Sequence, residues 1–126
     1  MSSQTLFSIV ESPVHPNFSA LYRRLGLKET RLESMRKAIG QLRKETPDIV
    51  VAEFFYGYGN NYAGINISNV DVFLLSLKKY TDNARVILMV DKGERQHVDK
   101  LNEQYPIHAV LTYPVSEVQM QQALAD

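Results

Sequence analysis

The chain contains no cysteine, carries no net charge and has no long apolar run, and each of these absences excludes a class of function. Without cysteine, its 126 residues form no disulfide, no cysteine-ligated metal site and no thiol nucleophile. Its 14 basic and 14 acidic side chains cancel, so we expect neither a nucleic acid nor a membrane as partner. No stretch approaches the ~20 apolar residues of a membrane helix, and the first residues lack the pattern of a signal peptide. These features fit a cytoplasmic protein.

Histidine is also scarce, and its three positions do not indicate a metal site. His15, His97 and His108 fall in different parts of the chain and lack the spacing of metal ligands. The hydrophobic fraction, in contrast, is 44%, which is typical of a folded protein rather than a disordered one. The length suits one domain, so we predict a single domain over residues 1–126.

The spacing of apolar residues alternates between that of strands and that of helices. The predicted strands are 6–10, 27–32 (a polar, weak edge strand), 48–54, 85–90 and 108–112. The predicted helices are 18–25, 35–42, 68–77, 93–104 and 116–124. Strands joined through helices pair in parallel, and runs without polar alternation are buried on both faces. The sequence therefore predicts an α/β domain with helices on both faces of a parallel sheet.

The helices of the second half carry specific packing expectations. Ser68 is predicted to cap the third helix. Leu75, beside the apolar stripe of that helix, is expected to be buried in the core, and the alternative is that it widens the stripe into a contact face. In the last helix, Val118 and Leu124 are expected to pack on the sheet. The apolar stripe of the third helix consists of Val70, Phe73, Leu74 and Leu77.

An acidic residue ends the strand at 48–54. The run Pro47-Asp48-Ile49-Val50-Val51-Ala52-Glu53 is apolar up to its terminal carboxylate. Open α/β sheets bind ligands in the crevice beyond the carboxyl ends of their strands. Glu11 follows the first strand in the same way. Both acids are therefore candidates for a site at this edge.

The element order, with the run 47–53 and the segment Val110-Leu111-Thr112-Tyr113-Pro114, resembles the receiver domain of bacterial two-component response regulators. The resemblance spans nearly the whole chain. It implies a flavodoxin-like, three-layer fold with a five-stranded parallel sheet of order 2-1-3-4-5. It also implies an active site in the loops at the carboxyl ends of the first, third, fourth and fifth strands.

The residues at the family's active-site positions depart from the family's pattern. Its phosphoacceptor aspartate falls on Glu53, and its magnesium-binding acidic pair falls on Glu11 and Ser12. Its hydroxyl residue falls on Val90 and its lysine on Tyr113. The proline after the lysine position is kept as Pro114, and the resemblance implies a cis bond before it.

These departures predict that the phosphorylation chemistry is lost. Phosphoryl transfer depends on in-line positioning and on cations that neutralise the phosphoryl oxygens. A phenol at position 113 removes one positive charge, and valine at position 90 removes a hydrogen-bond donor. Magnesium prefers near-octahedral oxygen ligands. The side chains of Glu11 and Glu53 are each one methylene longer than the family's residues, so their oxygens would not form that arrangement at the same place. We therefore expect a degenerate receiver without catalysis, cofactor or magnesium.

Such a module is expected to act through protein–protein contacts, with another signalling protein or by self-association. One alternative is a flavodoxin-like domain that binds a nucleotide or a flavin-type ligand. Another is a receiver module of a longer phosphorelay protein, and the sequence does not distinguish these.

Two residues of the degenerate site have more than one interpretation. Glu53 either stands in for an aspartyl phosphate and holds one signalling state, or it is a strand-end acid that accepts backbone N–H groups or faces water. Tyr113 either fills the emptied site and donates a hydrogen bond to Glu53 or Glu11, or it is an ordinary surface tyrosine.

The segment 54–67 is rich in aromatic residues, glycine and asparagine. Its candidate contact residues are Phe55, Tyr56, Tyr58 and Tyr62. Tyrosine among glycine and asparagine is typical of protein-binding loops, and long loops are often functional. Three roles remain open for this loop: a plug over the degenerate pocket, a partner-binding surface, or a contact to a small ligand.

Overall fold

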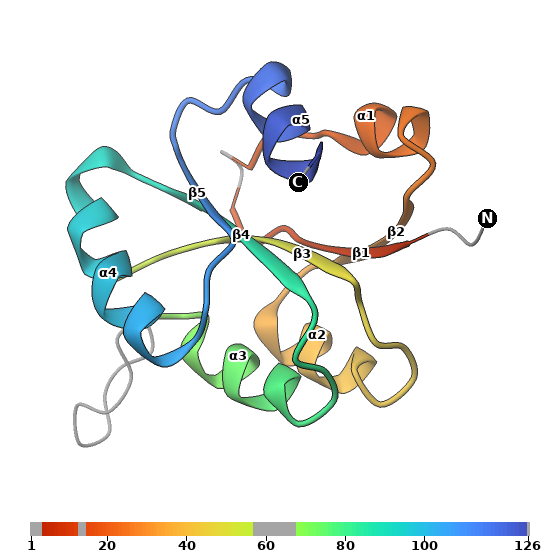
Figure 1. Ribbon diagram of the computed structural model, residues 1–126, viewed down its shortest axis with the longest axis horizontal. Helices are drawn as coiled ribbons and strands as arrows, with labels where there is room; N and C mark the ends of the chain where they lie inside the picture. Colours follow the sequence, from red (N-terminus) through yellow and green to blue (C-terminus); the bar gives the residue numbers. More distant parts are fainter. Residues whose placement is uncertain (1–3, 13–14, 57–67, 126) are drawn as a thin grey trace.

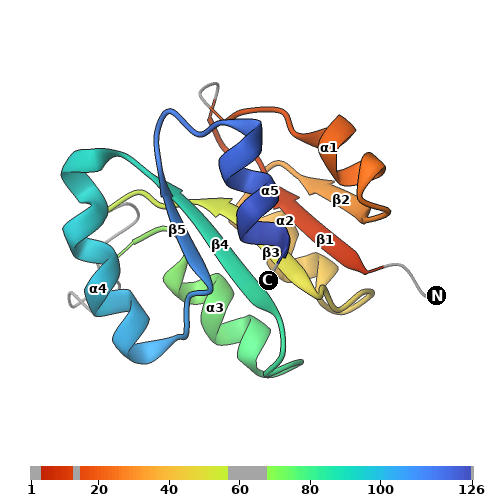
Figure 2. The ribbon, with the colours of Figure 1, turned by 45° about the horizontal axis from the view of Figure 1, so that its top comes forward.

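A computed structural model describes residues 4–12, 15–56 and 68–125 of the chain. Within this part, five parallel strands form one sheet of order β2-β1-β3-β4-β5 (Figures 1 and 2). The strands are β1 (Thr5–Ile9), β2 (Lys28–Leu32), β3 (Ile49–Glu53), β4 (Arg85–Val90) and β5 (Ala109–Thr112). Both the predicted set of strands and the predicted sheet order are confirmed.

Helices cover both faces of the sheet, as expected for strands joined by crossover connections. Helices α1 and α5 lie on one face, and α2, α3 and α4 lie on the other (Figure 1). A short 3₁₀ turn precedes α4. The elements are α1 (Ser19–Arg24), α2 (Met35–Gln41), α3 (Asp71–Lys78), η2 (Lys92–Glu94), α4 (Arg95–Gln104) and α5 (Glu117–Ala125).

Local sequence explains where two of these helices begin or end. Gly26 follows α1 with a positive φ of 78°, a conformation that glycine adopts without steric cost. Ser34 caps α2, because its Oγ accepts a hydrogen bond from the Lys37 N–H at 3.1 Å. Pro47 then separates α2 from β3.

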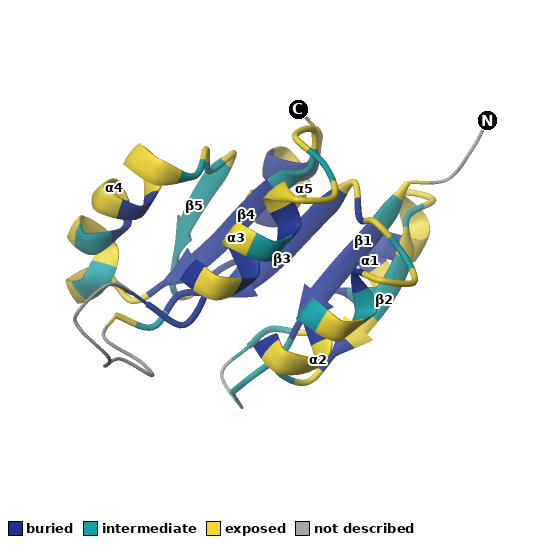
Figure 3. Ribbon diagram, turned by 90° about the horizontal axis from the view of Figure 1, so that it is seen from below, coloured by how far each residue is buried: buried dark blue, intermediate teal, exposed yellow. Residues whose placement is uncertain are grey.

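Successive residues of the central strands pack into two separate cores. Ile49 and Val51 of β3 face the core under α1 and α5, whereas Val50 and Ala52 face the core under α2, α3 and α4. The strand is therefore apolar at every position, because helices cover both of its faces. Figure 3 shows β1, β3 and β4 as buried and most of β2 and β5 as less buried.

The two edge strands are less buried than the strands between them. The polar strand β2 lies at one edge, as predicted, where charged side chains limit mispairing. Strand β5 forms the opposite edge, and all four of its residues are half-buried.

Three packing expectations are wrong. Ser68 does not cap α3, since the N-cap is Val70; Ser68 instead lies in the preceding turn, where its Oγ accepts from the Val70 N–H at 3.2 Å. Leu75 is 51% exposed, and Val118 is 64% exposed. Both lie on the outer sides of helices whose inner sides are already filled. The buried residues of these helices include Phe73, Leu74, Leu77, Met120, Ala123 and Leu124.

Candidate functional site

The carboxyl ends of β1 and β3 and the residue after β5 bring three predicted site residues together. Glu53 is the last residue of β3, Ser12 follows β1, and Tyr113 follows β5 directly. Because parallel strands end at the same edge, side chains from distant parts of the sequence meet there. The structure joins all three through the Glu53 carboxylate.

The Glu53 carboxylate is fully buried, with 0% exposure, and accepts four hydrogen bonds. Its Oε2 accepts from the backbone N–H groups of Glu11 at 2.9 Å and Ser12 at 3.1 Å. Its Oε1 accepts from the Ser12 hydroxyl and from the Tyr113 hydroxyl, the latter at 3.2 Å. An ionised carboxylate offers about four acceptor positions, so this set of donors saturates it. All four donors are uncharged groups.

Tyr113 fills the site, so the interpretation as an ordinary surface tyrosine is wrong. Its ring is half-buried and packs against the core under α1 and α5. Burial raises the pKa of the Tyr113 phenol well above its usual range, and the neighbouring Glu53 carboxylate raises that pKa further. The phenol is therefore a neutral hydrogen-bond donor at physiological pH. The bond between Tyr113 and Pro114 is cis, as predicted.

Replacing Tyr113 with phenylalanine tests how much this phenol contributes to stability. Tyr113→Phe removes one donor to a buried carboxylate, so we expect the free energy of unfolding to fall by about 1.5 kcal/mol. Urea denaturation measures the change. Tyr80→Phe is the matched control, because the Tyr80 ring is exposed and no side-chain hydrogen bond is recorded for it among the described residues. Equal effects of the two substitutions would contradict the assigned role of the hydroxyl.

The Glu11 side chain forms its hydrogen bonds with groups other than the Glu53 carboxylate. Its Oε1 accepts from Asn69 Nδ2 at 2.8 Å, and its Oε2 accepts from the Met35 N–H at 3.3 Å. Glu11 therefore links the end of β1 to the start of α2 and to the turn before α3. Only its backbone N–H contacts Glu53 among the recorded hydrogen bonds of the described residues.

Asn69 is a buried site residue that the sequence analysis missed. Besides Glu11, its Nδ2 donates to the Glu53 carbonyl at 2.8 Å, and its Oδ1 accepts from the Phe55 N–H at 2.7 Å. Its own N–H donates to the Phe55 carbonyl at 3.2 Å. The asparagine thus joins β1, β3 and the two ends of the segment 56–68. Its position directly before the apolar stripe of α3 was the available signal.

The remaining candidate residues make no recorded side-chain hydrogen bond to the Glu53 carboxylate among the described residues. Val90 is fully buried with the core residues under α2, α3 and α4, and Pro114 is exposed. Phe55 is half-buried. The Val90 carbonyl accepts from the Tyr113 N–H at 3.0 Å, so position 90 contributes a backbone contact to the residue that fills the site.

Tyr56 lies against α4, and its side chain is recorded in no contact with Glu53. Its ring is 52% exposed and stacks on His97, with ring centroids 3.5 Å apart and an angle of 12° between the planes. Its N–H donates to Glu94 Oε1 at 3.0 Å. The plug role is therefore not supported at Tyr56. Tyr58 and Tyr62 lie outside the described residues, so the role of the whole loop stays a prediction.

The surroundings of the site bear on ions and ligands. Among the described residues, no group of three or more acidic or histidine side chains is placed to hold a metal ion. An open hollow of about 470 Å³ adjoins the site and is lined by Pro16, Asp91, Tyr113, Pro114 and Val115. Across the described ranges, none of the helices is both long and apolar enough to span a bilayer.

Comparison with known proteins identifies the fold. No protein-family model matches the chain, and no curated protein matches it by sequence. Among solved structures, it is similar to a response regulator receiver protein from Sinorhizobium medicae WSM419, with a TM-score of 0.71, 15% identity, and coverage of 98% of this chain and 92% of that one. A CheY-like receiver domain from Methylobacillus flagellatus has a TM-score of 0.69 at 13% identity, with 98% of each chain covered.

A third similar structure was solved with a metal ion. It is the receiver domain of a sensor histidine kinase from Pseudomonas aeruginosa PAO1, with magnesium coordinated in its active-site cleft; the TM-score is 0.66 at 13% identity, with 98% of this chain and 95% of that one covered. The chain therefore has the fold of response regulator receiver domains, and the predicted flavodoxin-like class is confirmed.

Proposed function

We propose that this protein is a receiver-like signalling module that carries no phosphoryl group and acts by binding another protein. The observation that supports this proposal most directly is the state of Glu53. Its carboxylate, at the position that the sequence resemblance assigns to the family's phosphoacceptor, is fully buried and is saturated by four internal donors. The acid serves as an internal hydrogen-bond acceptor that ties the loop after β1 to the loop after β5.

Phosphorylation of Glu53 would have to undo this arrangement. An attacking carboxylate oxygen must be free and in line with the phosphoryl group. Freeing Oε1 breaks its hydrogen bonds with the hydroxyls of Ser12 and Tyr113, and hydrogen bonds to charged groups contribute about 1.5–3 kcal/mol each. The incoming group would also add nearly two negative charges beside a neutral phenol. No recorded cation contacts Glu53 among the described residues.

The acids present do not fit a magnesium ion. Magnesium requires near-octahedral oxygen ligands. Both Glu53 carboxylate oxygens already accept hydrogen bonds. Of the two Glu11 oxygens, Oε1 accepts from the Asn69 side chain and Oε2 accepts from the backbone N–H at the start of α2. Replacing these donors with a metal would dismantle the contacts that join β1, β3 and α2. The proposal therefore includes no magnesium-dependent step.

Mass spectrometry after treatment with acetyl phosphate or phosphoramidate and magnesium tests the proposal. We expect the intact mass to stay unchanged, because the Glu53 carboxylate is inaccessible and lacks a cationic partner. A conventional receiver domain treated in parallel is the positive control and should gain one phosphoryl group. A stoichiometric gain in this protein that disappears in Glu53→Gln would overturn the proposal.

A further inference from the structure

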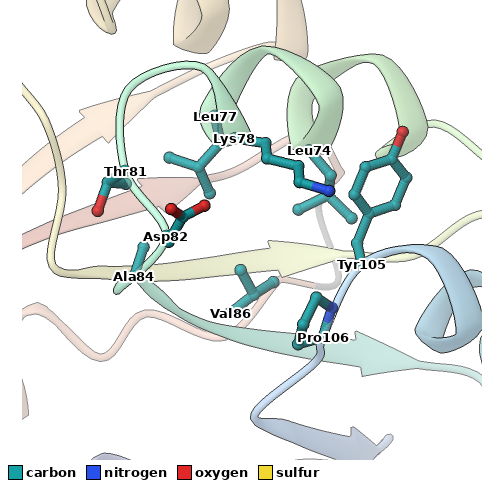
Figure 4. A pocket seen from close by; sticks show the side chains of 9 residues that line it. All are labelled: Leu74, Leu77, Lys78, Thr81, Asp82, Ala84, Val86, Tyr105 and Pro106. Atoms are coloured by element: carbon teal, nitrogen blue, oxygen red, sulfur yellow. The ribbon is translucent and has the colours of Figure 1, made fainter.

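A second concave feature lies away from Glu53, between α3 and α4 at the amino-terminal end of β4. It is a pocket of about 230 Å³ (Figure 4). Leu74 and Leu77 of α3 and Val86 of β4 contribute apolar side chains, and Tyr105 and Pro106 stand opposite α3. Val86 is near the amino-terminal end of β4, whereas Glu53 is at the carboxyl end of the parallel strand β3. The pocket and the Glu53 site therefore lie at opposite ends of the strands.

Two exposed apolar residues of α3 lie outside the pocket. Leu75 is 51% exposed and Val72 is 48% exposed, but helix geometry turns them about 100° or more away from Leu74, which lines the pocket. Single exposed apolar residues are ordinary, so the concave apolar pocket itself indicates the interaction site. We call the pocket together with Lys78 and Lys79 the α3 surface.

The α3 side of the pocket is basic, although the protein as a whole is neutral. Lys78 lies at the pocket rim and Lys79 follows it, both exposed; neither has a recorded ion pair among the described residues. Asp82 is the single acid that lines the pocket. The one acid within α3, Asp71, is buried, whereas α4 on the far side of the pocket carries a mixture of exposed charges, Asp99, Lys100 and Glu103.

The turn after α2 is also basic. Helices α2 and α3 lie side by side on the same face of the sheet (Figure 1). Arg43 and Lys44, which follow α2, are exposed and have no recorded ion pair within residues 4–12, 15–56 and 68–125. Complementary charge steers association and selects partners, so the unpaired Lys78 and Lys79, with these residues on the other side of α3, favour an acidic partner.

We propose that the α3 surface binds an acidic segment of another protein, which inserts one bulky apolar side chain into the pocket. The inference rests on the proposed function and names the surface and the chemistry of its partner. A cavity of 150 Å³ holds a benzene molecule, so the pocket accommodates a leucine or an aromatic side chain. It is smaller than the ~300–1,000 Å³ of small-molecule sites, which favours an anchor residue over a free ligand. The carboxylates of the segment pair with Lys78 and Lys79.

Selection from a random peptide library displayed on phage tests this inference on the intact chain. We expect enriched peptides to combine acidic residues with one leucine or aromatic residue. Binding of the enriched peptides is then measured by fluorescence polarisation. Ala84→Phe fills the pocket, because Ala84 lines it, and should weaken binding about tenfold or more, which corresponds to losing about 1.4 kcal/mol. The double substitution Lys78→Glu, Lys79→Glu should have an effect of similar size.

Arg23→Glu is the matched control for charge, because Arg23 is exposed on α1, on the opposite face of the sheet. It should leave the affinity within about twofold, a change of less than 0.5 kcal/mol. Melting temperatures establish that each variant is folded. Since Lys78 and Lys79 are exposed, the charge variant keeps the test valid even if Ala84→Phe fails to fold.

Several outcomes would overturn the inference. These are a library that yields no enriched peptide, enriched peptides that are basic, and affinities that survive both pocket and charge variants. A wild-type dimer in sedimentation that dissociates in Ala84→Phe would assign the surface to a second copy instead. Peptides that bind elsewhere refute the α3 surface but not the proposed function, whereas phosphorylation of Glu53 refutes the proposed function and leaves the peptide result interpretable.

Discussion

Glu53→Ala is expected to lower the free energy of unfolding by about 4 kcal/mol. The substitution leaves the N–H groups of Glu11 and Ser12 without their acceptor, and it removes the acceptor of two hydroxyls. A donor that is left without a partner costs about 1–3 kcal/mol, so the two backbone N–H groups alone account for about 4 kcal/mol. We therefore expect the largest loss of stability of any acid-to-alanine substitution on this edge of the sheet.

Glu53→Gln separates the loss of charge from the loss of hydrogen bonds. The glutamine carbonyl can accept from both backbone N–H groups, while its NH₂ group faces the hydroxyls of Ser12 and Tyr113, which can rotate and accept. We expect a loss of about 1 kcal/mol, far smaller than that of alanine. The ordering matters because an acid that worked mainly through its charge would be equally sensitive to both substitutions.

Urea denaturation, followed by circular dichroism, measures both variants. The slope of unfolding free energy against urea concentration should stay unchanged, which shows that the native state is equally compact. Glu103→Ala is the control, since Glu103 is exposed on α4 and has no recorded partner in the described part of the chain. A loss for Glu53→Ala no larger than for this control would show that the carboxylate contributes nothing to stability.

Asn69→Asp is expected to destabilise the protein strongly at neutral pH. The Asn69 Nδ2 donates to the Glu11 carboxylate and to the Glu53 carbonyl, both at 2.8 Å. In Asn69→Asp, a carboxylate oxygen replaces this donor and faces the Glu53 carbonyl and the negatively charged Glu11 carboxylate, neither of which can donate a hydrogen bond to it. The position is buried, so water does not compensate for the repulsion. We expect a loss of about 3 kcal/mol, in the range for an unpaired buried polar group or charge. Asn69→Ala removes the same hydrogen bonds without repulsion and should cost about 2 kcal/mol.

The pH dependence of Asn69→Asp distinguishes repulsion from the simple loss of hydrogen bonds. Repulsion from Glu11 raises the pKa of the introduced carboxyl in the folded state. The repulsive part of the loss is therefore absent well below the ordinary carboxyl pKa of about 4, grows as pH rises above that value, and is complete above the raised folded-state pKa. Measured against wild type by urea denaturation, the deficit should be smaller at about pH 5 than at about pH 8. Asn69→Ala should show the same deficit at both values; a parallel pH dependence in both variants would contradict the argument.

Much of the architecture followed from periodicity, because apolar runs and helical stripes report burial directly. Four runs of consecutive apolar residues marked the sheet, and the proline and glycine positions separated the elements. The failures share one cause. Leu75 and Val118 are apolar but exposed. Whether a helix side or a strand edge is covered depends on its neighbours in space, which spacing along the chain does not record.

The Glu53 site divides in the same way. The assignment of Tyr113 to the position that the resemblance gives to the family's lysine, and the expectation of a hydrogen bond from that phenol to an acid, followed from residue chemistry. The roles of Asn69 and of the Glu11 side chain did not, because they depend on contacts across 58 positions between residues 11 and 69. The sequence likewise predicted only that Tyr56 is one of several contact residues of its loop. Its stacking on His97 depends on how α4 lies beside Tyr56 in the folded protein.

The amino-acid sequence by itself determined the fold class, the strand order implied by the family resemblance, and the absence of a lysine and of a hydroxyl side chain at two positions of the site. These depend on residue identity and on local spacing. Tertiary structure alone decided that Glu53 is saturated by internal donors and that an apolar pocket with Lys78 in its lining lies between α3 and α4. The physical reason is that hydrogen-bond saturation and exposure are properties of neighbours brought together by folding.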